Sequence, residues 1–185
     1  MNYQRIIEEW KQIAEDFFRA KGHIFEKVTN LSIERLRAGN KILIFGNGGS
    51  AAQAQHFAAE LVNKFLKIRG PIRAIALTTD TSGMTSIAND TSFDYVFSRQ
   101  IEALGDKGDV AIGLSTSGKS PNVIEAIKVA KEKELLTVAL TGKGGGKLQF
   151  LADYLLDVPS ESTPRIQEVH ILLLHLLAEE IEKKC

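Results

Sequence analysis

The chain has 185 residues, of which 44% are hydrophobic and 25% charged, a composition typical of a soluble globular protein and not of a disordered or low-complexity one. Lys and Arg together number 23, as do Asp and Glu, so there is no electrostatic case for a dedicated nucleic-acid binder, although a local basic patch stays open. The one cysteine, Cys185, excludes a disulfide within the chain. No membrane-length apolar run or signal-peptide pattern occurs, and we expect a cytoplasmic protein that does not contact membranes.

The first part of the chain has a helical pattern. Residues 3–38 carry apolar side chains at three- and four-residue steps, which predicts amphipathic helices with Gly22 as a candidate break. Gly39-Asn40 ends this pattern as a helix C-terminus does. We expect residues 1–38 to be a helical extension of one domain that spans residues 1–185.

After residue 40, short β-rich runs alternate with helical patterns. Strands are expected at Lys41–Phe45, Ile72–Thr78, Val110–Ser115, Leu136–Thr141 and Tyr154–Val158. Helices are expected at Ser50–Phe65, Thr81–Asn89, Phe93–Leu104, Pro121–Lys133 and Lys147–Ala152. The strands are almost continuously apolar, as in a parallel sheet covered on both faces. The alternation predicts an α/β fold with a doubly wound, five-stranded parallel sheet.

The last predicted helix, Thr163–Lys184, is apolar nearly all round its middle. Such a helix must be buried on more than one side. Because the N-terminal helices also need partners, we expect the two ends of the chain to form a helical layer between subunits.

Two strand-to-helix loops are candidates for a binding site, because ligands of open α/β sheets lie beyond the carboxyl ends of the strands. The first loop, Gly46–Ala51, has small residues that let the backbone approach a ligand at a helix N-terminus. The second, Ser115–Pro121, places four hydroxyls around a glycine and then a proline suited to begin a helix. The second loop predicts a phosphate cradle.

Two other interpretations of these loops stay open from the residues alone. Both loops could be plain turns in which Ser50 and Ser120 cap the following helices. The spacing Gly46-x-Gly48-x-x-Ala51 also matches a dinucleotide-binding fingerprint, but Asp80 lies well beyond the ~20 residues at which that fingerprint places its acidic partner.

Four polar side chains on two predicted helices could carry chemistry. His56 and Glu60 are four residues apart, so they share one helix face, as a metal site, a proton-transfer pair or an ordinary helix hydrogen bond would require. Gln167 and His175 are about 12 Å apart along their helix, and they meet one site only if both lean inward or different subunits supply them. In its apolar surroundings, His175 could equally be a buried core residue.

Six segments together resemble the phosphoheptose isomerases of the sugar isomerase (SIS) domain superfamily, in the order of that family. They are GNGGSA (46–51), AQHFAAEL (54–61), IANDTSF (87–93), LSTSGKSPNVIEAI (114–127), LTGKGGGKL (140–148) and RIQEVH…H (165–175). The resemblance implies a homotetramer that converts D-sedoheptulose 7-phosphate to D-glycero-D-manno-heptose 7-phosphate, the first step towards activated heptose for glycans such as lipopolysaccharide.

The resemblance also implies roles for individual residues. Glu60 would be the catalytic base and His175 the acid, acting through an enediol. The metal would be zinc, one per subunit, held by His56, Glu60, Gln167 and His175. The phosphate would lie on Ser115, Thr116, Ser117 and Ser120. The remaining substrate contacts would come from Asn47, Gly48, Gly49, Ser50, Glu60, Asn89, Asp90 and Gln167.

Two positions depart from the family pattern, and rival functions remain. Lys64 stands where many members have Arg, and Pro164 where some have Asp, so substrate positioning could differ. One rival is a non-catalytic tetrameric scaffold similar to the DnaA initiator-associating protein, which lacks the catalytic carboxylate and final histidine. The other is an enzyme or sensor of the same superfamily that acts on hexose or amino-sugar phosphates.

Overall fold

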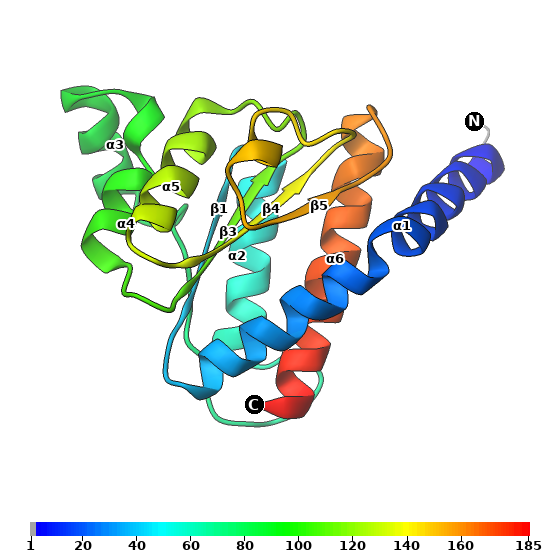
Figure 1. The fold of residues 1–185 in the computed structure, drawn as a ribbon, viewed down its shortest axis with the longest axis horizontal. Helices are drawn as coiled ribbons and strands as arrows, with labels where there is room; N and C mark the ends of the chain where they lie inside the picture. Colours follow the sequence, from blue (N-terminus) through cyan, green and yellow to red (C-terminus); the bar gives the residue numbers. More distant parts are fainter. Residues whose placement is uncertain (1–2) are drawn as a thin grey trace.

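A computed structural model of the protein describes residues 3–185; residues 1 and 2, which belong to the predicted N-terminal extension, lie outside the described residues. Its centre is a five-stranded sheet of order β2-β1-β3-β4-β5 in which every pair is parallel (Figure 1). The strands are β1 (Ile42–Gly46), β2 (Ala74–Ala76), β3 (Val110–Ser115), β4 (Leu136–Thr141) and β5 (Tyr154–Asp157). The predicted fold class is confirmed.

Helices cover both faces of the sheet. The face that carries Ile42 and Ile44 packs on α1 (Tyr3–Arg37), α2 (Gly49–Val62) and α6 (Thr163–Lys184). The face that carries Leu43 and Phe45 packs on α3 (Thr81–Asp90), α4 (Ser98–Leu104) and α5 (Pro121–Glu132). Consecutive residues of a strand point to opposite faces, so a strand between two helical layers must be apolar throughout, as β1 is.

Several element boundaries differ from the predictions. The helix α1 runs through Gly22 without a break. Strand β2 has only three residues, because it is an edge strand whose ladder with β1 ends at Ala76. The predicted helix over 147–152 is a single 3-10 turn, Leu148–Phe150, since so short a segment cannot nucleate an α-helix after three glycines of positive φ. The helix predicted over 93–104 is a 3-10 turn, Phe93–Tyr95, followed by α4.

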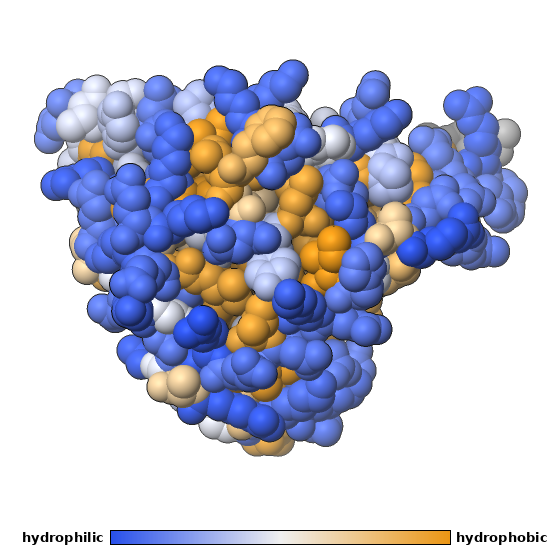
Figure 2. Space-filling model, in the orientation of Figure 1, coloured by the Kyte–Doolittle hydropathy of each residue, from blue (hydrophilic) through white to orange (hydrophobic). Residues whose placement is uncertain are grey.

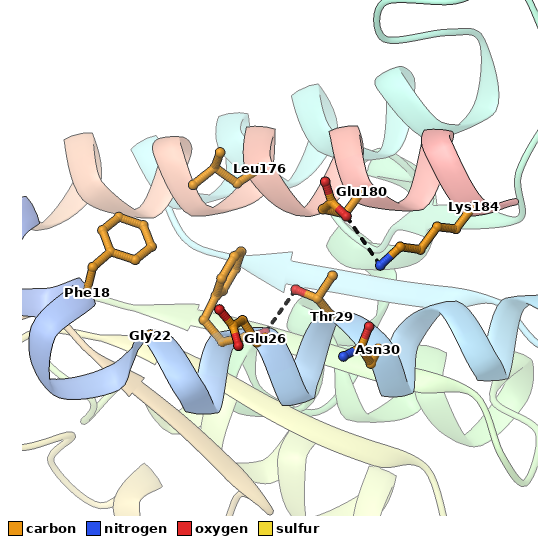
Figure 3. A pocket seen from close by; sticks show the side chains of 9 residues that line it. Phe18, Gly22, Glu26, Thr29, Asn30, Leu176, Glu180 and Lys184 are labelled. Atoms are coloured by element: carbon orange, nitrogen blue, oxygen red, sulfur yellow. Dashed lines mark hydrogen bonds and ion pairs between the residues drawn. The ribbon is translucent and has the colours of Figure 1, made fainter.

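The two terminal helices cross on the same side of the sheet and leave apolar surface between them. Phe18 on α1 and Leu176 on α6 point into a groove of about 460 Å³ (Figure 3). The N-terminal half of α1 projects beyond the rest of the molecule, and hydrophobic side chains stay in view down the middle of this face (Figures 1 and 2). Within residues 3–185, no helix is both long and apolar enough to cross a membrane.

The strand order identifies where a ligand would bind. From β1 the chain crosses through α2 to β2 on one side, whereas from β3 it crosses through α5 to β4 on the other. The crevice between β1 and β3 is therefore the point at which the winding direction reverses, and ligands of such sheets bind beyond the carboxyl ends of the strands there. Both loops singled out from the sequence border this crevice.

Candidate functional site

The first loop brings backbone close to backbone at the end of β1. A Cβ at Gly46 would lie 2.9 Å from the carbonyl oxygen of Leu114, so β1 and β3 approach too closely there for any side chain. Gly48 has φ +55° and is the N-cap of α2. Ser50 lies inside α2 and is buried, so the alternative interpretation in which it caps the helix is wrong; its role as a substrate contact stays a prediction.

The second loop gathers hydroxyls at the start of α5. Ser115 Oγ lies 2.9 Å from Ser120 Oγ and 3.5 Å from Ser117 Oγ. Ser120 occupies the N-cap position, but its side chain makes no capping hydrogen bond to the backbone. Hydroxyls that bond one another instead of capping the helix can turn towards an anion placed at the positive end of α5.

A pair of amides joins the two loops across the crevice. Asn47 and Asn122 donate to each other's side-chain oxygens, both at 2.9 Å. Asn122 is buried and belongs to the first turn of α5. Sequence reasoning missed Asn122; a polar residue directly after the hydroxyl-rich loop was the one signal for it. The pair fixes the spacing of the loops, and it engages the Asn47 side chain that was predicted to bind sugar.

Three of the predicted chemical groups converge about two turns along α2 from the first loop. His56 Nε2 lies 3.0 Å from Glu60 Oε1 and 3.0 Å from His175 Nε2, and His175 Nε2 lies 3.6 Å from the same Glu60 oxygen. The helical spacing brings Glu60 to His56, whereas the packing of α2 on α6 brings His175 to both. The side chain of His175 is 39% exposed, so it is not a buried core histidine.

The donor set of this cluster fits a zinc ion. Ligands about 2.0–2.1 Å from a tetrahedral zinc stand about 3.3 Å from one another, close to the three distances observed. Glu60 Oε2 is buried without a hydrogen-bond partner. Burial raises the pKa of the Glu60 carboxyl, and the neighbouring His56 and His175 offset this only in part. A cation bound among these groups would stabilise the charged form of the buried Glu60 carboxylate.

The fourth predicted ligand, Gln167, is placed by the first loop. A Cβ at Gly49 would lie 2.6 Å from Gln167 Nε2. The backbone carbonyl of Gln167 accepts a hydrogen bond of 2.7 Å from Gln53 Nε2. Gln167 therefore lies against the first loop and the first turns of α2, about 12 Å along α6 from His175, and is not brought to the histidine cluster of the same chain. Its role as a zinc ligand stays a prediction.

Asn89 and Asp90, two predicted sugar contacts, lie at the end of α3 and bond to each other at 2.8 Å. Because α3 covers the opposite face of the sheet from α2 and α6, the structure does not bring these two residues to the histidine cluster. Asp80 caps α3 by accepting a hydrogen bond from the Gly83 amide. The dinucleotide interpretation would need this carboxylate to bind a ribose hydroxyl instead.

Phe65, Arg69 and Glu182 were not singled out in the sequence, because no motif or spacing marks them. The Phe65 ring stacks on the His175 imidazole, with centroids 5.7 Å apart and planes at 24°. Glu182 and Arg69 form a buried ion pair near the end of α2.

Lys64 and Pro164, the departures from the family pattern, are both exposed, the first just after α2 and the second in the first turn of α6.

A buried histidine links α6 to the loops. His170 Nε2 lies 3.1 Å from the Thr141 carbonyl oxygen at the end of β4, and its Nδ1 is buried without a partner. Burial lowers the pKa of His170 to about 4. Next to Thr141, the Gly142 amide donates to the Thr116 carbonyl. This hydrogen bond joins the end of β4 to the hydroxyl-rich loop.

Comparisons with known proteins find similar sequences and folds. Residues 6–142 match the sequence model of the SIS domain. The chain is 54% identical to a phosphoheptose isomerase of Campylobacter jejuni over 176 residues, which are 95% of this chain and 94% of that protein.

Two solved structures are similar over their full length. The phosphoheptose isomerase GmhA from Neisseria gonorrhoeae matches with a TM-score of 0.91 at 43% identity, covering 99% of this chain and 100% of that one. A phosphoheptose isomerase from Francisella tularensis matches with a TM-score of 0.94 at 35% identity, covering 98% and 97%.

Proposed function

The chain belongs to the SIS domain family and, within it, to the phosphoheptose isomerases, and on that premise we propose that it converts D-sedoheptulose 7-phosphate to D-glycero-D-manno-heptose 7-phosphate. The observation that carries the proposal is the convergence of His56, Glu60 and His175 from α2 and α6, in a chain whose second loop can hold a phosphate.

The phosphate of the substrate binds the second loop in this proposal. The hydroxyls of Ser115, Thr116, Ser117 and Ser120 donate to its oxygens, and the N-terminus of α5 adds a partial positive charge. Because the phosphate is remote from C1 and C2 of the sugar, its binding energy orients the reacting carbons and does not change during the reaction.

The proton transfers fall to Glu60 and His175. Glu60 takes the proton from C1 of the ketose to form the enediol and returns it to C2, while His175 exchanges the proton between the two sugar oxygens. Burial raises the pKa of Glu60, which makes its carboxylate a stronger base than an exposed one. Zinc would be held by His56, Glu60 and His175, with Gln167 supplied by a second subunit, and it would provide Lewis-acid polarisation of the sugar oxygens.

We also propose that the chain acts as a cytoplasmic homotetramer in which residues 1–185 form one SIS domain with one zinc site. The projecting start of α1 supports an oligomer, because Ile6 and Ile7 are exposed there and, with Trp10, line a second apolar groove of about 370 Å³. A cytoplasmic location is consistent with an ionised sugar phosphate, which does not cross membranes unaided.

The alternative of a non-catalytic scaffold is disfavoured by the same cluster. A scaffold has no need of a carboxylate and two imidazoles with three donor atoms in mutual contact. Their convergence from two helices, with a buried carboxylate oxygen left without a partner, costs stability and is expected where it serves chemistry.

The test is turnover of sedoheptulose 7-phosphate by the purified protein, followed by NMR, with and without a chelator. Wild-type protein should form the heptose 7-phosphate, and Glu60→Gln should reduce kcat by at least about a thousandfold while the fold is retained. Gln55→Glu, on the same helix, is a control for an altered charge near the site. Wild-type protein that stays inactive after zinc is added would refute the proposal and favour the non-catalytic scaffold.

A further inference from the structure

The segment Asn63–Gly70, between α2 and β2, has no regular structure, and most of its side chains are exposed. Phe65 and Arg69 are its two half-buried side chains. Phe65 stacks on one side of the His175 ring, and His56 contacts that ring edge-on, with centroids 5.2 Å apart and planes at 65°. The orientation of the His175 imidazole therefore depends on where this irregular segment lies.

One carboxylate holds the segment in place. Glu182, on α6, accepts hydrogen bonds from three consecutive backbone amides, those of Phe65, Leu66 and Lys67, at 2.9, 2.7 and 2.9 Å. Its side chain is only 2% exposed. Burial alone would raise the pKa of Glu182, but these three amides and Arg69 lower it, so the group is a carboxylate. A buried carboxylate with this many donors is a rigid attachment point.

Arg69 connects the same carboxylate to the helix that carries Glu60. Its Nε lies 3.2 Å from Glu182 Oε1. Its terminal nitrogens donate to the carbonyl oxygens of Glu60 and Leu61, both at 2.8 Å, in the last turn of α2. Carbonyls at a helix C-terminus have no partner within the helix, and Arg69 satisfies two of them.

Glu182 itself does not touch the reacting groups. It follows His175 by seven residues, so it lies on the same face of α6 about 10 Å further along the axis. Its contact with His175 is made through Phe65 and its contact with α2 through Arg69, while its charge also acts at a distance and contributes to the raised pKa of Glu60.

We propose that Glu182, itself paired with Arg69, is a positioning residue of the isomerisation, which holds Phe65 against His175 so that the imidazole Nε2 faces Glu60. This inference rests on the proposed function, since it assigns Glu182 a part in that reaction. Loss of the Phe65 ring or of the Glu182 charge would leave the substrate loops untouched and let the His175 ring rotate.

The experiment compares four single variants, and the double variant that combines Phe65→Leu with Glu182→Gln, with the wild-type protein. Phe65→Leu removes the stacked ring, Phe65→Tyr keeps it, Glu182→Gln removes the buried charge, and Glu179→Gln is a matched control on the exposed side of α6. The readouts are kcat and KM for sedoheptulose 7-phosphate, zinc affinity by competition with a chromogenic chelator, and the thermal midpoint.

Phe65→Leu and Glu182→Gln should each lower kcat about five- to tenfold, keep KM within about twofold, and weaken zinc binding severalfold. Because Glu182→Gln already releases Phe65, adding Phe65→Leu should make the double variant no slower than Glu182→Gln alone. Phe65→Tyr and Glu179→Gln should match the wild-type protein.

Wild-type kcat and zinc affinity in Phe65→Leu would overturn the inference, as would single effects that multiply in the double variant. A lower thermal midpoint in Glu182→Gln with unchanged kcat per folded subunit would show a structural role only, and would also overturn it. If Glu182→Gln does not fold, the contrast between Phe65→Leu and Phe65→Tyr decides. A wild-type protein without isomerase activity refutes the proposed function instead, and zinc competition then decides the positioning role.

Discussion

Acid should destabilise this protein through His170, by an amount that follows from its surroundings. The imidazole is fully buried, Nε2 donates to the Thr141 carbonyl, and Nδ1 has no partner. Protonation would put a charge and an unsatisfied N–H in the core, and burial accordingly lowers the pKa from 6.5 to about 4. Below about pH 6.5 the unfolded chain binds a proton that the folded chain does not, so stability falls as the pH falls towards 4.

The size of this effect follows from the two pKa values. A shift from 6.5 to about 4 corresponds to about 3 kcal/mol of stability that is complete above pH 6.5 and lost below pH 4. At about pH 5 the loss amounts to about 2 kcal/mol relative to about pH 8. Other groups also titrate in this range, so the effect must be isolated by a variant that lacks the imidazole.

The assay is urea unfolding of wild-type and His170→Gln proteins at about pH 8 and pH 5, with chelator present and protein concentration fixed. Glutamine can still donate to Thr141 but does not titrate. Between these pH values, the wild-type protein should lose about 2 kcal/mol more stability than His170→Gln. His23→Gln, at an exposed histidine on α1, should lose as much as the wild-type protein. If wild-type and His170→Gln lose stability equally, the assignment of His170 as a buried neutral base is wrong.

Three further predictions concern the crevice. Ser120→Ala should raise KM about tenfold with little change in kcat, because it removes one hydrogen bond to a charged phosphate; steady-state kinetics that show a lower kcat alone would contradict this. Gly49→Ala should displace the Gln167 amide, since the new Cβ would lie 2.6 Å from it, and should weaken zinc affinity in a chelator competition, whereas Gly70→Ala, which meets open space, should not. Asn122→Ala should cost about 1–3 kcal/mol in urea unfolding by leaving the partner amide unpaired, and adding Asn47→Ala should cost little more; additive losses would show that the pair is not coupled.

Local spacing in the sequence was enough for the features that lie within one element. The alternation of apolar strands with helices predicted the parallel sheet, because a strand covered on both faces has no polar side. The composition of Ser115–Pro121 predicted hydroxyls gathered at a helix N-terminus, and the four-residue step from His56 to Glu60 predicted their shared face. These relations depend on backbone geometry that repeats in every helix and strand.

Contacts with neighbouring helices and strands decided where β2 ends and whether α1 is broken. Strand β2 ends where its ladder with β1 ends, and the continuity of α1 through Gly22 depends on the contacts of that helix with α6 and the sheet. Glycine weakens a helix by only about 1 kcal/mol, which packing of the flanking turns readily exceeds. Propensity alone could not decide either case.

The site as a whole is a product of the tertiary structure. From the residues alone, His175 could have been a core residue, and only the packing of α2 on α6 brings its ring to Glu60, 115 positions away in the chain. The same packing brings Glu182 to Phe65. The parallel pairing of β1 with β3 brings Asn47 to Asn122. A sequence specifies distances along one element through the regular backbone, whereas distances between elements are set by how buried apolar faces fit together, and no local pattern encodes that fit.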